Sequence, residues 1–264
     1  MASAQESRGR VERAFARAQT FSGWGDFGIN VRTLGPDLPW NYDSLARAAV
    51  RNARSTLDLA TGGGERFLGI IQGQPGRYTA TEAWPVNVPV AATRLGPEGV
   101  AVVRCASSGG ESLPFRDAAF DLILNRHGGI NAAEISRVLQ RGGRFLSQQI
   151  DPADWPELKR FFPRMTDSSH NGGARLRTTF EQLGLRTTFE RHDYEVAYGA
   201  LEDLVFNLAV TPWTIPGFSL GTDLDALVSL ERALTTGEGL VLTRALFLLS
   251  AVKPNELLRP AATG

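Results

Sequence analysis

The feature that most constrains the fold is an alternation of short apolar runs with segments of helical period between residues 55 and 150. Short apolar runs bounded by glycine, proline or polar residues predict buried strands. We expect these strands at residues 56–60, 78–82, 100–105, 120–125 and 144–150. Two sets of apolar residues recur at helical spacing between them: Phe67, Ile70 and Ile71, then Ile135, Val138 and Leu139. Strands that alternate with one-faced helices predict a parallel sheet wound with helices.

The segments on either side of this alternation are less regular. Residues 9–19 and 42–52 have helical patterns, and the stretches around Trp24 and Trp40 are rich in glycine, proline and aromatic residues, so residues 1–54 are expected to form a helical lid. After residue 150 we expect helices at 155–161 and 174–183 and strands at 185–198 and 239–252, with residues 199–238 inserted as a cap. The pair Gly142-Gly143 is expected to end a helix before the strand at 144.

Length and charge narrow the class of protein. With 264 residues the chain is expected to fold as one elaborated domain, in which residues 55–150 are the ligand-binding core and residues 151–264 the C-terminal half. Its 28 basic and 28 acidic residues create no overall positive field, which disfavours nucleic acid as a partner. The apolar stretch 245–252 is shorter than the roughly 20 residues that span a bilayer, so no membrane segment is expected.

Cysteine content and the N-terminus bear on the compartment. Cys105 is the single cysteine, which excludes an internal disulfide and a cysteine-based metal site and fits a reducing environment. Residues 1–10 contain no apolar core of a secretory signal. A cytoplasmic location is therefore expected, with Cys105 interpreted as a small core residue.

A glycine-rich turn follows the first expected strand. Residues 57–65 have the sequence LDLATGGGE, which places Asp58 in the strand, Gly62 and Gly64 in the turn and a helix after it. Glycine at such a turn lets a ligand approach the backbone closely. Glu82 ends the second strand, where an acid would bind ribose hydroxyls. This arrangement predicts a site for a nucleoside-containing ligand.

The spacing of the glycines separates two classes of ligand. A dinucleotide fingerprint that starts at Gly62 would need a third glycine at the position of Phe67. Asp58, which precedes the glycines, is instead suited to a ligand with a positively charged amino-acid end.

These residues resemble motif I of the class I S-adenosylmethionine-dependent methyltransferases, with Ala60 where that family commonly has glycine. Two further segments are similar to the family in the same order: LPFRDAAFDLILN at 113–125 and EISRVLQRGGRFL at 134–146. The resemblance implies a Rossmann-like, doubly wound, mostly parallel sheet of seven strands with an antiparallel last strand, and S-adenosylmethionine as cofactor. It implies cofactor-binding roles for the following residues: Asp58, Ala60, Thr61, Gly62, Gly64, Glu82, Ala106 and Asn125.

His127 is the candidate catalytic residue. It follows the expected strand 120–125, at the carboxyl edge where ligands bind in doubly wound sheets, and histidine can take a proton near neutral pH. The alternative is a structural loop histidine. His170 and His192 are weaker candidates, and Gln148 and Gln149 should point to opposite faces of their strand.

Methyl transfer from a sulfonium needs few catalytic groups, because the enzyme mainly aligns donor and acceptor. The neutral charge and the aromatic residues Trp24, Phe27, Trp40 and Trp213, which either close over the site or belong to the core, favour a small, partly apolar methyl acceptor. The alternatives are an RNA-base methyltransferase and a methyltransferase-like protein that binds the cofactor without transferring the methyl group. The sequence leaves the acceptor atom and the oligomeric state open.

Overall fold

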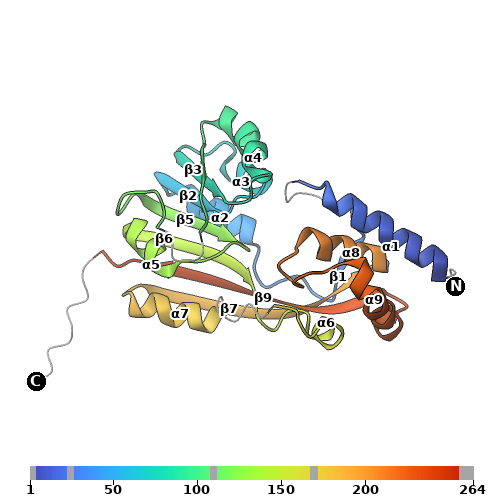
Figure 1. The fold of residues 1–264 in the computed structure, drawn as a ribbon. Helices are drawn as coiled ribbons and strands as arrows, with labels where there is room; N and C mark the ends of the chain where they lie inside the picture. Colours follow the sequence, from blue (N-terminus) through green and yellow to red (C-terminus); the bar gives the residue numbers. More distant parts are fainter. Residues whose placement is uncertain (1–3, 23–26, 108–111, 167–171, 256–264) are drawn as a thin grey trace, which may run out of the picture.

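The computed structural model describes residues 4–22, 27–107, 112–166 and 172–255, which include one mixed sheet of nine strands (Figure 1). Its order is β1-β7-β9-β6-β5-β2-β3-β4, and β8 pairs with β9 alone. The strands are β1 (Val31–Leu34), β2 (Ser55–Leu59), β3 (Arg77–Glu82), β4 (Ala101–Arg104), β5 (Phe120–Arg126), β6 (Leu139–Ile150), β7 (Arg186–Tyr198), β8 (Thr235–Thr236) and β9 (Gly239–Val252). The predicted doubly wound sheet with an antiparallel last strand is confirmed, and β1 and β8 extend it beyond the seven expected strands.

The parallel half of the sheet carries the helices of a wound α/β fold. β2 pairs in parallel with β3 and β5, β4 with β3, and β6 with β5. These helices are α2 (Tyr42–Val50), α3 (Glu65–Ile71), α4 (Asn87–Leu95) and α5 (Ala132–Val138), with a short 3₁₀ helix η1 (Gly96–Glu98) after α4. α7 (Gly173–Gln182) packs on β7 and β9, and α6 (Pro156–Phe161) packs on β9 and the helix at Leu220–Leu234. All five strands expected between residues 55 and 150 are present, so the carboxyl ends of β2, β3, β4 and β5 meet at one edge of the sheet.

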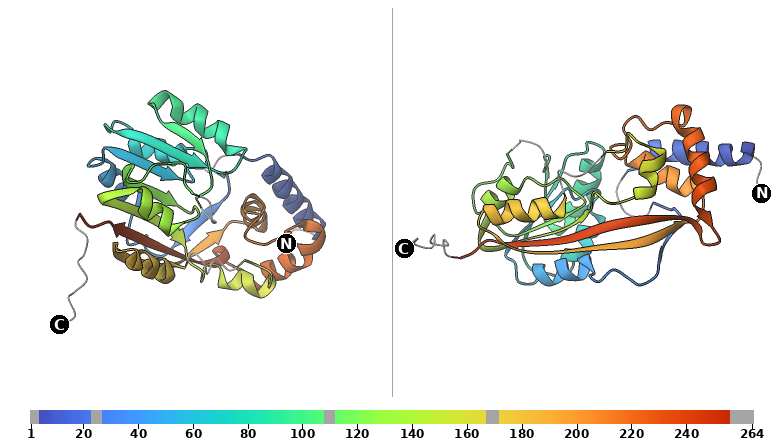
Figure 2. Two further views of the ribbon diagram at one scale, coloured as in Figure 1. Left: turned by 60° about the vertical axis from the view of Figure 1, so that its left-hand side comes forward. Right: turned by 90° about the horizontal axis from the view of Figure 1, so that it is seen from below.

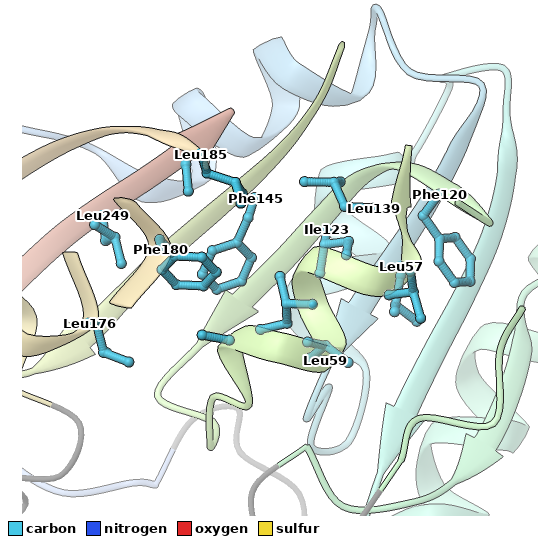
Figure 3. Packing of buried hydrophobic residues seen from close by; sticks show 14 of the residues in the cluster. Leu57, Leu59, Phe120, Ile123, Leu139, Phe145, Leu176, Phe180, Leu185 and Leu249 are labelled. Atoms are coloured by element: carbon cyan, nitrogen blue, oxygen red, sulfur yellow. The ribbon is translucent and has the colours of Figure 1, made fainter. Parts of the chain in front are cut away.

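The two faces of the sheet alternate as the strand period requires. Leu57, Ile123 and Phe145 point to the face that α5 and α7 cover, and Phe180 of α7 packs on Phe145 (Figure 3). Neighbouring residues such as Leu124 point to the other face, against α2, α3 and α4. Burial on both faces explains why these strands are continuous apolar runs in the sequence.

Gly142 and Gly143 lie inside β6, which corrects the expectation that they end a helix. α5 already ends at Val138. Gly142 has φ +75°, and the pairing of β5 with β6 shifts register between Phe120 and Leu122. A Cβ at Gly143 would lie 2.9 Å from the Gln140 carbonyl oxygen, so the backbone needs glycine at this irregularity.

The antiparallel half is a long hairpin of β7 and β9. Residues 246–252 of β9 pair with both β6 and β7, whereas residues 240–245 extend past β6 and pair with β7. Figure 2 shows the two strands running side by side from the core to the helices at the other end. There α8 (Leu201–Val210) and α9 (Leu220–Leu234) form the expected cap between β7 and β9.

The expected N-terminal lid divides between the two ends of the molecule. α1 (Ala4–Gln19) packs against α8 of the cap, with Val11 buried in the cap's apolar cluster (Figure 1). α2 packs instead against α3 and β5 of the core. Trp24 lies outside the described residues. None of the helices among the described residues combines the length and apolarity needed to cross a bilayer.

Candidate functional site

The glycine-rich turn after β2 has a tightly wound backbone. Three of its residues have positive φ angles: Ala60 (+58°), Gly62 (+64°) and Gly64 (+82°). The Thr61 N–H donates to the Thr81 carbonyl at 2.8 Å, and the Ala60 N–H donates to the Thr81 hydroxyl at 3.2 Å. β3 therefore fixes the turn. Ala60 adopts a left-handed conformation that favours glycine, which gives a physical reason for the family's preference at this position.

Close packing holds this turn between two neighbouring segments. A Cβ at Gly64 would lie 2.8 Å from the Leu95 side chain of α4, and a Cβ at Gly128 would lie 2.5 Å from the Cβ of Ala60. Gly128 belongs to the turn after β5, so that turn rests directly on the glycine-rich turn. No role for Gly128 was predicted from the sequence.

Glu82 connects the second strand to the glycine-rich turn. One carboxylate oxygen accepts from the Gly62 N–H and the other from the Trp84 N–H, both at 2.7 Å. The side chain is buried, and this burial raises the pKa of Glu82 above its ordinary value. Each oxygen keeps a second lone pair, with which it can accept a hydrogen bond from a ligand hydroxyl.

Asp58 is the second acid of the site. Burial raises the pKa of Asp58 to about 7, the negative charge of Glu82 acts in the same direction, and the Thr61 hydroxyl opposes the shift. A half-buried carboxyl next to another acid is a place where a bound cation is favourable. The donor set fits S-adenosylmethionine, because Asp58 suits its ammonium and Glu82 its ribose hydroxyls.

His127 lies directly after β5 with φ +59°, and its N–H donates to the Gln148 carbonyl at 2.9 Å. Loss of hydration lowers the pKa of His127 well below its ordinary value. The positive charges of Arg126, Arg244 and Arg66 act in the same direction. The ring is therefore neutral at pH 7 and able to accept a proton.

Gln148 and Trp40 are in contact beside His127, and no local sequence motif predicts this contact. The Trp40 indole N–H donates to Gln148 Oε1 at 2.9 Å, and Gln148 Nε2 lies 3.5 Å from His127 Nε2. Trp40 is buried, and the ring of His192 meets it edge-on at 6.5 Å between centroids. Trp40 thus belongs to the wall of the site. His170 lies outside the described residues.

Asn125 points to the opposite face from His127. It is fully buried and donates to the Leu59 carbonyl at 3.2 Å, while its side-chain oxygen accepts from the Ser147 hydroxyl at 3.2 Å and from Gln149. As expected, Gln148 and Gln149 point to different faces. The Asn125 amide therefore braces the ends of β2 and β6 from behind the glycine-rich turn.

Ala106 follows β4 at the same edge of the sheet. The N–H of Cys105, the residue before Ala106, donates to the Glu82 carbonyl at 3.2 Å. This bond places the segment beside the end of β3. The loop continues into residues 108–111, which lie outside the described residues. Ala106 is half-buried, and its contact with a cofactor stays a prediction.

A cavity of about 520 Å³ lies between the cap and the core. Its lining is mostly apolar and comes from α1 and the residues that follow it, the segment after β3, and the cap, including Phe15, Phe21, Trp84, Leu208, Trp213 and Phe218. Trp84 and Trp213 are both about half exposed and meet edge-on at 6.4 Å between centroids. The cavity adjoins the site through Trp84, two residues after Glu82, whereas Asp58 and His127 are not among its lining residues.

Comparison with known proteins agrees with this geometry. Residues 57–147 match a family model described as a methyltransferase domain. The demethylmenaquinone methyltransferase of Thermus thermophilus is 30% identical over 128 residues, which cover 46% of this chain and 58% of that protein. The ubiquinone/menaquinone biosynthesis C-methyltransferase UbiE of Psychromonas ingrahamii is 29% identical over 144 residues, covering 50% and 57%. The matches thus span less than three fifths of these relatives.

The fold of this chain is similar to the folds of solved structures. The YcgJ protein of Bacillus subtilis superposes with a TM-score of 0.58 at 20% identity, over 81% of this chain and 97% of that one. Residues 57–147 thus match the methyltransferase-domain family, and the sheet around them has the Rossmann-like arrangement of these solved structures. Members of this family use S-adenosylmethionine as the methyl donor.

Proposed function

We propose that this protein transfers a methyl group from S-adenosylmethionine to a small, partly apolar acceptor by direct displacement. The observation that carries the proposal is the bond between Glu82 and the Gly62 N–H, because it joins the glycine-rich turn to the acid at the end of β3 beside Asp58. The two acids then bind opposite ends of one ligand, the ribose at Glu82 and the ammonium at Asp58.

The bound cofactor supplies an activated methyl group on a sulfonium, and the chain's own residues supply alignment. The turn that contains Gly62 and Gly64 lets the ligand approach the backbone, and Gly128 keeps the turn after β5 against it. His127 is exposed at this edge as a neutral imidazole, which supports a role in taking a proton from the acceptor or in positioning it.

The aromatic cavity supports a partly apolar acceptor. Its volume of about 520 Å³ and its apolar lining suit a small organic molecule. The curated relatives named above act on quinone precursors according to their names, and a quinone ring would fit such a lining. Because those matches cover only part of each relative, the quinone class is one acceptor class to test among others.

Two measurements test the function. A calorimetric titration should show binding of S-adenosylmethionine and S-adenosylhomocysteine but not of NAD, and a labelled-methyl assay against cell extracts and a quinone panel should identify the acceptor. Cofactor binding without any methyl transfer would favour a binding protein, and transfer to RNA would favour the RNA-base alternative. Tight NAD binding without adenosylmethionine binding would overturn the proposal.

His127→Ala tests the catalytic assignment. A positioned general base contributes roughly 10²–10⁴-fold, so turnover should fall by about that factor while affinity for S-adenosylhomocysteine stays nearly unchanged. The matched control is His192→Ala, which removes a ring beside Trp40 from β7 and should keep most of the turnover. Unchanged turnover in His127→Ala would make this residue a structural loop histidine.

A further inference from the structure

Arg126 is a cation at the edge of the proposed site for which the described residues supply no ion-pair partner. It is the last residue of β5 and lies between Asn125 and His127. Its side chain is half-buried, and its Nε atom is fully buried without a hydrogen-bond partner. Within the described residues, Arg126 takes part in no ion pair. Arg66 and Arg244, whose positive charges also lower the pKa of His127, each have an acidic partner.

The neighbouring acids are already occupied. Asp43 is the carboxylate that acts on Arg126, but Arg66 donates to both of its oxygens, at 2.7 and 2.5 Å. Arg244, whose charge acts on His127 as that of Arg126 does, is paired with Asp154 at 2.9 Å. Of these three guanidiniums, Arg126 is therefore the one whose positive charge is not paired with a carboxylate of the described residues.

The surroundings make this charge costly in the absence of a ligand. Burial and the positive charge of Arg66 lower the pKa of Arg126 to about 10, so the guanidinium is still charged at neutral pH. A half-buried guanidinium with free donors is a strong binder of carboxylates, because its planar fork can donate two parallel hydrogen bonds.

Tyr42 connects Arg126 to the site. Its hydroxyl is buried and feels both the negative charge of Asp58 and the positive charge of Arg126. In the register of β2 and β5, Asp58 lies opposite Leu124, which is two residues before Arg126, so the acid and the guanidinium lie on the same face of the sheet. Tyr42 packs on this face, in one cluster with Leu124. The opposite charges of Asp58 and Arg126 match the ammonium and the carboxylate of an amino acid.

We propose that Arg126 binds a carboxylate that enters the site beside Tyr42. The inference rests on the proposed function, because the ligand that brings the carboxylate is either the amino-acid end of the cofactor or an acidic acceptor. The juxtaposition with Asp58 favours the cofactor. In either case the positive charge that the free protein leaves uncompensated is neutralised when the ligand binds.

The test compares two ligands that differ in the amino-acid end. S-adenosylhomocysteine has a carboxylate, and 5′-methylthioadenosine has the same nucleoside without it. In Arg126→Gln, calorimetry should show a loss of affinity for S-adenosylhomocysteine of roughly 10- to 100-fold, the range of a charge-assisted hydrogen bond, with methylthioadenosine nearly unaffected. The control is Arg177→Gln, which removes an exposed guanidinium of α7 and should change neither affinity.

The stability of the ligand-free protein gives an independent readout. Arg126→Met removes the uncompensated charge and keeps an unbranched side chain, so its melting temperature should equal or exceed that of the wild type. A guanidinium that served only to hold the fold would give the opposite result.

A second titration separates the two sources of the carboxylate. Benzoate is titrated into protein saturated with S-adenosylhomocysteine. In one outcome, Arg126→Gln leaves the ratio of the affinities for S-adenosylhomocysteine and methylthioadenosine as it is in the wild type. If the variant then fails to bind benzoate while the wild type binds it, the carboxylate comes from the acceptor. If that ratio is unchanged and benzoate behaves alike in both proteins, the proposal is overturned. Failure of the wild type to bind S-adenosylhomocysteine would instead contradict the proposed function.

Discussion

Cofactor affinity should depend on pH through Asp58. Burial, with the charge of Glu82 acting in the same direction, raises the pKa of this carboxyl to about 7, so in the free protein it is mostly protonated below neutrality. If Asp58 binds the ligand's ammonium, it must be ionised in the complex. Binding of S-adenosylhomocysteine should therefore weaken as the pH falls, and it should release a proton.

The magnitude follows from the ionised fraction. With a pKa of about 7, that fraction is roughly 75% at pH 7.5 and roughly 1% at pH 5, so affinity should fall by roughly 80-fold over this range. At pH 6, binding should release nearly one proton per ligand. Calorimetry at this pH in two buffers of different ionisation enthalpy measures that number directly.

The variant Asp58→Asn isolates the effect from Glu82, whose pKa burial also raises. It should bind the ligand weakly at every pH, with a nearly flat profile. A flat profile in the wild type, or a proton release near zero at pH 6, would refute the assigned role of Asp58.

The same shift changes the stability of the ligand-free protein in a defined direction. The pKa of Asp58 is higher in the folded state than its ordinary value of 3.8, so the folded chain binds the extra proton and is favoured at low pH. This contribution is fully present below pH 3.8 and is lost as the pH rises through about 7. The full shift corresponds to roughly 4 kcal/mol, and solvent contact of the half-buried side chain reduces it. Asp58→Asn should therefore have a higher melting temperature than the wild type at pH 8.

Two further substitutions test the turn. Glu82→Ala should weaken binding of S-adenosylhomocysteine by roughly 1.5–3 kcal/mol and lower the melting temperature, because the N–H groups of Gly62 and Trp84 lose their acceptor; normal cofactor binding by a folded variant would show that Glu82 does not hold the ribose. Ala60→Gly should raise the free energy of unfolding by about 0.5–1 kcal/mol in urea denaturation, because relief of the left-handed conformation exceeds the entropic cost of glycine. A less stable Ala60→Gly protein would mean that the methyl group's packing outweighs the backbone strain.

The core strands could be predicted because their periodicity is local. β2, β5 and β6 contain apolar runs that are buried on both faces, and that burial leaves a direct trace in the sequence. β4, at the edge of the sheet, has no fully buried residue and was predicted from its short apolar run alone. β1 was missed because Val31–Leu34 is an exposed edge strand that pairs only with β7. α4 was missed because Pro85 and Pro89 suggest a loop, yet Pro89 lies in the first turn of the helix, where its missing N–H has no intrahelical partner to lose.

Some parts of the candidate site could be predicted from local sequence, and others depend on contacts between distant residues. Asp58 near the end of β2 and Gly62 and Gly64 in the turn after it are close together in the chain, so their spacing alone made them candidates. The bond between Trp40 and Gln148 joins residues that are 108 positions apart, and only the fold reveals it. The isolated charge of Arg126 was equally invisible, because it depends on Arg66 already holding Asp43.

The proposed cofactor site and the aromatic cavity are built from different parts of the fold. The proposed cofactor site lies on short turns at the edge of the parallel strands, and Gly128 packs the turn of His127 against the glycine-rich turn, so these parts form one rigid unit. The aromatic cavity, in contrast, draws its walls from α1, the segment after β3 and the cap. The cap is attached through the part of β9 that extends beyond β6. Residues of the cavity can therefore vary without disturbing the turn that is proposed to bind the nucleoside. We expect the choice of acceptor to depend on these cavity segments, for which the sequence offers no motif.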